Sequence, residues 1–304
     1  MNWFLLALIA PLSWSIANYL DKYILSSSKN EENGGSGGLL ILSCLVSIIF
    51  AFCIFAVQGF DKLILPSQTT GALVFSGMFE ALYLIFYFWA LERESTTTVI
   101  SLFQFAPIMG LLFGYLFLSE IPNGTQVFAI LLILIGTLFI VYKKGEKSSF
   151  KWNILLLMLA STTFVGFYNT LFKLFGEHIF FWTAVFWQYI GIGIIGFIFF
   201  VVSPQYQREV FGMLKGRGSK SLLLTGAAEL MNIFAILATN AAVLLAPVAI
   251  VLAIGSVQPL FVLIEGLIIV KLFPKLLSEE EKPSLKLQYL IGIILVCIGG
   301  FIIY

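Results

Sequence analysis

The sequence predicts an all-α integral membrane protein of ten transmembrane helices, arranged as two five-helix repeats of inverted topology. The 304-residue chain is 60% hydrophobic and only 11% charged, whereas soluble domains carry about 25% charged residues. Apolar runs of about 18 residues or more recur along the chain, and each can cross the hydrocarbon core as a helix. Residues 18–22 (NYLDK) return as residues 169–173 (NTLFK), which indicates an internal duplication.

Ten apolar segments predict the spanning helices, and polar breaks separate them. The first segment lacks a basic start and a small-residue cleavage site, so a spanning helix is expected there rather than a signal peptide. Two tight junctions, at residues 91–97 and 242–247, join neighbouring spans, and Pro247 suits the first position of a new helix. Longer loops are predicted at residues 29–38, 143–151, 208–220 and 275–286. The predicted spans are roughly 3–25, 38–57, 72–91, 97–118, 125–142, 152–175, 180–202, 222–244, 247–270 and 286–304.

Further spacings recur in the two halves. Pro107 and Pro259 follow the two repeated asparagines by 89 and 90 residues, and Glu80 and Glu229 follow them by 62 and 60 residues. Each unit has five spans, an odd number, so the second unit must enter the membrane from the opposite side. Inverted repeats of this kind are typical of secondary transporters. The predicted units are residues 1–147 and 148–304.

Lysine and arginine residues gather on one predicted side of the membrane. The loops that follow spans 1, 3, 5, 7 and 9 hold 15 of the 17 basic residues, and the other loops hold 2. Because cytoplasmic loops are enriched in Lys and Arg, this count predicts that both termini face outside.

Three stretches carry motifs in a characteristic order: residues 10–23 (APLSWSIANYLDKY), residues 91–120 with LERES, LFQFAP and FLSE, and residues 246–259, which begin with AP and end with QP. In these the chain resembles the EamA-type proteins of the drug/metabolite transporter superfamily. The resemblance covers essentially the whole chain and implies a ten-helix transporter with both termini in the cytoplasm, against the charge count. One departure is that Lys271 stands where a second-half counterpart of Glu120 would fall.

Three carboxylates lie within predicted spans: Glu80, Glu229 and Glu265. An ionisable group inside a membrane usually faces a cavity or a partner. Burial favours the protonated form of a carboxyl group, so these residues are candidate sites for coupling to a proton or a cation. The alternative is a neutral glutamic acid that is hydrogen-bonded between helices.

The repeated motif supplies two asparagines and two lysines. Asn18 and Asn169 are expected to contact substrate or to form hydrogen bonds between helices. Lys22 and Lys173 end their spans on opposite membrane faces, which makes them candidate gate or vestibule residues. The alternatives for the lysines are snorkelling to the headgroups and an internal salt bridge with Asp21 or a glutamate.

Two spans carry an amide shortly before a proline, Gln104 before Pro107 and Gln258 before Pro259. A proline inside a span bends the helix and frees a backbone carbonyl. The prolines are therefore predicted hinges, and the glutamines are candidate substrate contacts.

Aromatic residues are abundant, and Trp14, Tyr83 and Trp187 lie deep in their spans. They are candidates for the lining of a cavity that takes an amphiphilic or aromatic solute, with lipid-facing packing as the alternative. Gly110 and Gly114 form a GxxxG face that permits close helix packing within the chain or in a dimer.

The preferred function is a secondary transporter that moves a small metabolite (an amino acid, an amphiphilic solute or a drug-like solute) by alternating access and with possible proton coupling. The alternative is a lipid flippase of the same fold. An enzyme is disfavoured because His178 is the only histidine and no GxSxG or P-loop motif is present. No cofactor, metal or nucleic-acid partner is expected. The expected setting is a bacterial-type inner membrane, as a monomer or a homodimer.

Overall fold

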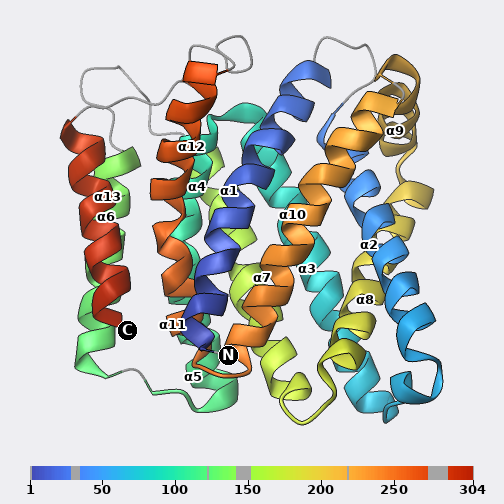
Figure 1. Cartoon of the computed structure of the whole chain (residues 1–304), viewed down its shortest axis with the longest axis horizontal. Coiled ribbons are helices and arrows are strands. Elements are labelled where there is room, and N and C mark those ends of the chain that lie inside the picture. Colours follow the sequence, from blue (N-terminus) through green and yellow to red (C-terminus); the bar gives the residue numbers. More distant parts are fainter. Residues whose placement is uncertain are drawn as a thin grey trace.

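The structure is a computed structural model that describes residues 2–28, 35–121, 123–141, 152–217, 219–272 and 287–303. Within these ranges the regular structure is entirely helical (Figure 1). The elements are α1 (Trp3–Ser28), α2 (Ser36–Gln58), η1 (Asp61–Leu63), α3 (Ser67–Arg93), α4 (Thr96–Leu102), η2 (Phe103–Phe105), α5 (Ala106–Leu118), α6 (Gly124–Val141), α7 (Trp152–Gly176), α8 (Phe181–Val202), α9 (Pro204–Arg217), α10 (Ser219–Val243), α11 (Val248–Ile254), η3 (Gly255–Val257), α12 (Gln258–Leu272) and α13 (Leu287–Ile303).

Eight helical segments of the described chain are long and apolar enough to cross a membrane, and two shorter apolar helices lie in α6 and α13. The protein is thus an all-α, multi-pass membrane protein. Two of the predicted spans are each built from two α-helices joined by a short 3-10 turn, at η2 and at η3. The predicted loops at 143–151 and 275–286 lie outside the described residues.

The predicted loop at 208–220 is wrong, because most of it belongs to the helix α9. This helix is amphipathic: Val210 and Met213 are buried, while Arg208 and Lys215 are exposed. Glu209 attaches it to the bundle, since its Oε2 accepts a hydrogen bond from the Gly38 backbone N–H at 2.9 Å. A carboxylate at the N-terminus of α2 is favourable because the first N–H groups of a helix have no partner within the helix.

The spacing of side chains along α1 shows how the helices face lipid and core. Large apolar residues recur every three or four positions on its exposed side, and small or polar residues such as Ala10 and Ala17 lie on the buried side. Residues three or four apart share one face of a helix. The exposed face therefore suits lipid; it carries Leu5, Ile9, Leu12 and Ile16.

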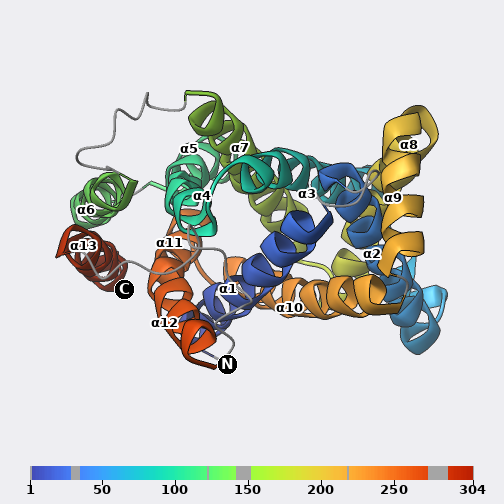
Figure 2. The same cartoon turned by 90° about the horizontal axis from the view of Figure 1, so that it is seen from above.

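Helices from the two predicted halves pack on one another. α1 packs on α10, α3 packs on α7 and α8, α2 packs on α8, and α5 packs on α7 and α11. Seen from above, α6 and α13 form a pair at one edge of the bundle, and α2, α8 and α9 lie at the other edge (Figure 2).

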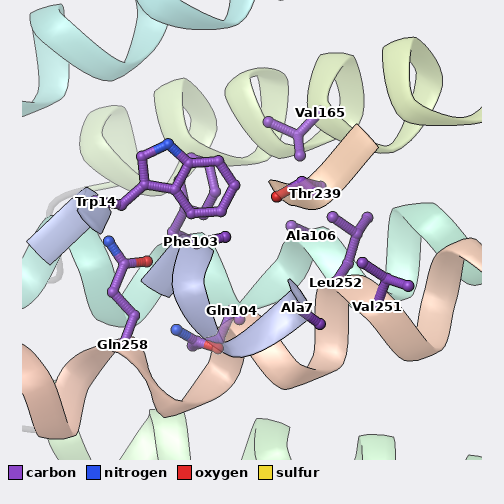
Figure 3. Close-up of a pocket in the computed structure, with 12 residues that line it drawn as sticks. Ala7, Trp14, Phe103, Gln104, Ala106, Val165, Thr239, Val251, Leu252 and Gln258 are labelled. Carbon is purple, nitrogen blue, oxygen red and sulfur yellow. The ribbon is translucent and has the colours of Figure 1, made fainter. Parts of the chain in front are cut away.

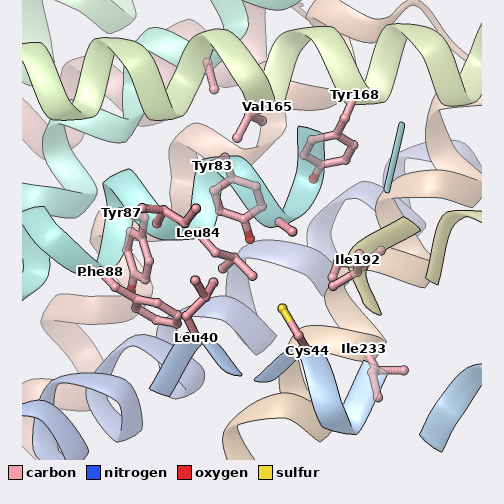
Figure 4. Close-up of a cluster of buried hydrophobic side chains, with 14 of the residues drawn as sticks. Leu40, Cys44, Tyr83, Leu84, Tyr87, Phe88, Val165, Tyr168, Ile192 and Ile233 are labelled. Carbon is pink, nitrogen blue, oxygen red and sulfur yellow. The ribbon is translucent and has the colours of Figure 1, made fainter. Parts of the chain in front are cut away.

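The apolar core lies between α2, α3, α7, α8 and α10 (Figure 4). Its largest fully buried side chains include Phe88, Tyr168, Phe172 and Tyr189. Glycines let two of these helices approach closely: a Cβ at Gly77 of α3 would meet the Gln188 carbonyl of α8, and a Cβ at Gly191 of α8 would meet the Val74 carbonyl of α3. Close backbone contact between small residues is typical of helix pairs in membranes.

Candidate functional site

A small cavity lies between α1, α5, α7, α10 and α11, which come from both predicted halves (Figure 3). Its volume is about 20 Å³, which is room for about one water molecule. Trp14, Phe103, Gln104, Thr239 and Gln258 supply its aromatic and polar wall. The remaining lining is apolar or small and consists of Ala7, Ala10, Ala106, Val165, Val251, Leu252 and Gly255.

A second cavity of about 20 Å³ adjoins the first, because Trp14, Phe103 and Gln258 line both. The second cavity is more polar and more aromatic than the first. Its other lining residues are Asn18, Asp21, Tyr83, Leu84, Tyr87, Ile100 and Asn232. The two cavities together are called the central site below.

Three polar atoms of α1 at this site have no hydrogen-bond partner among the described residues: Trp14 Nε1, Asn18 Nδ2 and Asp21 Oδ1. Asn18 is 5% exposed and Asp21 is 2% exposed. The Tyr87 hydroxyl donates to Asn18 Oδ1 at 2.6 Å, which fixes the amide and leaves its NH₂ group unused. A buried polar group without a partner costs about 1–3 kcal/mol, so this face of α1 fits a polar ligand.

Asp21 was not predicted as a site residue and was considered only as a partner for a lysine. Its spacing could have revealed it, since Trp14, Asn18 and Asp21 are separated by four and three positions and share one helix face. Asn232 and Tyr87 were also absent from the predicted site, although each is a polar residue in an apolar span.

Aromatic rings form one wall of the central site. Tyr83 and Phe103 have ring centroids 6.2 Å apart, and Tyr87 and Phe103 have centroids 6.4 Å apart, both edge to face. Trp14 and Tyr83 thus come together as candidates. Trp187 lines neither cavity, and its indole N–H donates to the Leu63 carbonyl at 2.8 Å instead.

The two predicted hinges fall at equivalent places. Pro107 is the second residue of α5, directly after η2, and Pro259 is the second residue of α12, directly after η3. Each turn follows a seven-residue helix, α4 or α11. Gln104 lies within η2 and Gln258 begins α12, so both amides reach the central site beside the change in helix geometry.

Glu80 belongs to a separate chain of buried hydrogen bonds that joins three helices. Gln188 of α8 donates to Glu80 Oε2 at 2.6 Å and accepts from Asn240 Nδ2 of α10 at 2.6 Å. All three side chains are at most 1% exposed. Gln188 was missed, although it is the only amide residue in an otherwise apolar span.

The other two predicted carboxylates hold different partners. Asn232 donates to Glu229 Oε1 at 3.2 Å and also lines the central site, so Glu229 lies directly behind that wall. Ser15 donates to Glu265 Oε1 at 2.7 Å and so ties α1 to α12.

The repeated asparagines are not equivalent in the structure. Asn18 lines the central site. Asn169 lines neither of its cavities, and its Nδ2 donates to the Val165 carbonyl of its own helix at 2.9 Å.

The repeated lysines both turn toward helix junctions within their own halves. Lys22 Nζ donates to the carbonyls of Leu91 and Glu94 at 2.7 and 2.6 Å, at the junction of α3 and α4. Lys173 Nζ donates to the Ala246 carbonyl at 2.7 Å, at the junction of α10 and α11. These bonds hold the lysines inward, unlike snorkelling side chains.

Lys173 also joins the halves through Glu120. The ammonium lies 2.8 Å from Glu120 Oε1, and Glu120 Oε2 accepts from the Val248 backbone N–H at 2.9 Å. Lys173, Glu120 and Val248 are called the latch below. Glu120 also lines a cavity of about 110 Å³ between α5, α6 and α11.

No group of three or more His, Cys, Asp or Glu residues in the described part of the chain is arranged to hold a metal ion.

Comparisons with known proteins agree with this architecture. Residues 1–142 match the model of the EamA-like transporter family. A comparison with curated protein sequences found no significant match. A solved crystal structure that is 14% identical in sequence has the same fold, with a TM-score of 0.59 over 99% of this chain and 95% of the other. Residues 1–142, which carry the first-helix and LERES motifs, are therefore similar to the EamA-like transporter family.

Proposed function

We propose that the protein is a secondary-active transporter that moves a small amphiphilic solute across a bacterial-type inner membrane by alternating access. The central site carries this proposal, because its unpartnered polar atoms lie deep among spanning helices of both predicted halves. A binding site at the meeting of two repeats is typical of such transporters. Each of its cavities is too small for a metabolite, so the proposal requires the site to widen when solute binds.

We further propose that the ten spans form two five-helix repeats of inverted topology, with a boundary near residue 147. The packing supports this, because contacts come in matching pairs. The first helix of one half packs on the third helix of the other in both directions, as α1 on α10 and α7 on α3. The second, fourth and fifth helices each pack on their own counterparts, as α2 on α8, α5 on α11 and α6 on α13.

Alternating access needs elements that can change shape and contacts that can break. The turns η2 and η3 interrupt corresponding spans beside the central site, which makes them suitable hinges. The latch joins the two halves at the end of the bundle where α7 ends, so its opening would release the halves there.

We assign proton coupling to the chain of Glu80, Gln188 and Asn240. Glu80 Oε1 has no partner among the described residues, although its other oxygen is bound. A carboxyl group at this depth can take up and lose a proton when water reaches it from one side or the other.

Flux in proteoliposomes tests the transport function. Purified protein is reconstituted, and uptake of a panel of radiolabelled amines, amino acids and organic acids is measured with and without a pH gradient. Protein-dependent uptake that saturates is the expected result. A parallel arm with fluorescent phospholipids tests the flippase alternative, and lipid movement without uptake of any soluble compound would contradict the proposal.

The coupling assignment needs its own variants. Glu80→Gln with Glu229→Gln is expected to keep solute exchange while abolishing uptake driven by the pH gradient. Glu177→Gln is the matched control, because Glu177 is exposed beyond the end of α7. Unchanged gradient-driven flux in the double variant would remove the coupling claim and leave transport itself intact.

A further inference from the structure

We infer that the solute is an organic amine, whose ammonium group is bound by Asp21 and whose apolar body lies in the first cavity. This inference rests on the transport function proposed above and names the chemical class of its substrate.

The buried carboxyl group at the central site suits a cationic ligand. Asp21 is buried, its Oδ1 has no partner among the described residues, and neither cavity is lined by a lysine, arginine or histidine. The neighbouring Lys22 is engaged by the Leu91 and Glu94 carbonyls. A second carboxyl group, Glu229, lies behind Asn232. Buried charges are normally paired, and a bound ammonium group would supply the missing partner.

The aromatic wall suits the same ligand. Trp14, Tyr83, Tyr87 and Phe103 line the cavity that contains Asp21. Aromatic faces attract ammonium groups, and this attraction increases when water is excluded. A carboxylate within an aromatic wall therefore discriminates an amine from a neutral or acidic analogue of the same shape.

Two further free atoms on α1 indicate a second polar group on the ligand. Trp14 Nε1 and Asn18 Nδ2 are donors without partners, one turn apart on the face of α1 that carries Asp21. They would bind an acceptor, such as a hydroxyl or carbonyl oxygen, close to the nitrogen of the ligand.

The two cavities differ in the polarity of their lining residues, and this difference orients the ligand. Each has a volume of about 20 Å³, and an ammonium group is similar in size to the one water molecule that such a volume holds. The first cavity continues from Trp14 and Phe103 toward Ala7, Val251 and Leu252. An apolar body is expected to enter there as the bundle opens.

Binding to the purified protein tests the inference with four related probes: phenylalaninol, phenethylamine, 2-phenylethanol and 3-phenylpropionate. Thermal stability is measured at millimolar concentrations, because a ligand of the folded state raises the unfolding temperature. The expected order is phenylalaninol above phenethylamine, with no shift from the alcohol or the acid. Equal shifts from all four probes, or none from either amine, would overturn the inference.

Variants then locate the ammonium group. Asp21→Asn is expected to weaken phenylalaninol binding by about tenfold or more, because a charge-assisted bond is lost. Asp21→Glu should retain amine selectivity. Asp61→Asn is the control, since Asp61 is exposed in η1. Trp14→Phe keeps a ring but removes the N–H, so it should weaken phenylalaninol more than phenethylamine, and it provides a second test if Asp21→Asn does not fold.

The results separate this inference from the transport proposal. Amine binding that depends on Asp21 without flux in proteoliposomes would sustain the site and refute transport. Saturable flux of non-amines that is unaffected by amines or by Asp21→Asn would sustain transport and refute the amine assignment. Asp21→Asn that abolishes gradient-driven flux but leaves amine affinity unchanged would also overturn the assignment, because Asp21 would then serve coupling.

Discussion

At the scale of single residues, the hydrogen bonds of Gln188 differ from those of the polar groups at the central site. Gln188 uses both ends of its amide to join Glu80 and Asn240. Trp14, Asn18 and Asp21 instead keep free atoms at the central site. Polar groups buried in a membrane rarely lack a partner, so free atoms that also line a cavity support a solute site there.

The amide at position 188 gives a direct prediction. Gln188→Leu should lower the free energy of unfolding by about 1–3 kcal/mol for each partner left unsatisfied, Glu80 and Asn240. Thermal and denaturant unfolding in detergent micelles measures this loss. Gln68→Leu is the control, because Gln68 is exposed at the start of α3, and equal stability of the two variants would contradict the prediction.

The latch can be measured as a coupling energy. Lys173 and Glu120 are 13% and 17% exposed, so their pairing is better shielded from water than a surface pair. Glu120→Gln, Lys173→Met and the double variant should show a coupling of about 0.5–3 kcal/mol in a double-mutant cycle. Lys62→Met, at an exposed lysine, is the control, and additive single costs would show that the pair contributes nothing.

At the scale of elements, close helix contact depends on which glycines face a neighbour. Gly77 and Gly191 face each other's helices across the α3–α8 crossing. Gly110 of the predicted GxxxG face packs against Leu252 and Ala249, so it serves α5–α11 packing within the chain. Gly71, on the same helix as Gly77, has open space around it.

Two substitutions in α3 should therefore have opposite effects. Gly77→Ala would place a methyl group against the Gln188 carbonyl, and overpacking of this kind costs about 1–3 kcal/mol. Gly71→Ala should be neutral or stabilising by up to about 1 kcal/mol, because alanine favours a helix. Unfolding temperatures in micelles compare them, and a similar loss in both would mean that helix contact does not decide the outcome.

At the scale of the whole molecule, the described chain begins and ends at the same end of the bundle, and α9 with its exposed basic residues lies at the opposite end (Figure 1). The distribution of Lys and Arg predicts that the end with α9 is cytoplasmic and that both termini face outside. The family resemblance implies the reverse orientation.

Reporter fusions decide the orientation. Alkaline phosphatase fused after residue 304 should be active, and green fluorescent protein fused there should be dark, because the former needs an external location and the latter a cytoplasmic one. Fusions within residues 143–151, on the other predicted side, should give the opposite pair. A fluorescent C-terminal fusion would show that the family orientation holds despite the charge count.

The sequence by itself determined the membrane class, the helical composition and the similarity of residues 1–142 to the EamA-like transporter family. Length and hydropathy fix these properties because a spanning segment must bury its backbone hydrogen bonds and expose apolar side chains. The amphipathic helix α9 was not predicted, because its basic, glycine-containing sequence resembles that of a polar loop. Pro107 and Pro259 predicted that their spans would be bent. The 3-10 turns η2 and η3 that precede them were not predicted.

Only the tertiary structure decided which polar residues meet. Trp14, Tyr83, Gln104 and Gln258 converge with Asn18 and Asp21, while Asn169, Trp187 and Glu265 take other partners. The repeat made Asn18 and Asn169 look equivalent, yet only one lines the central site. The physical reason is that a hydrogen bond between helices depends on their rotation and crossing, which arise from contacts far apart in the sequence.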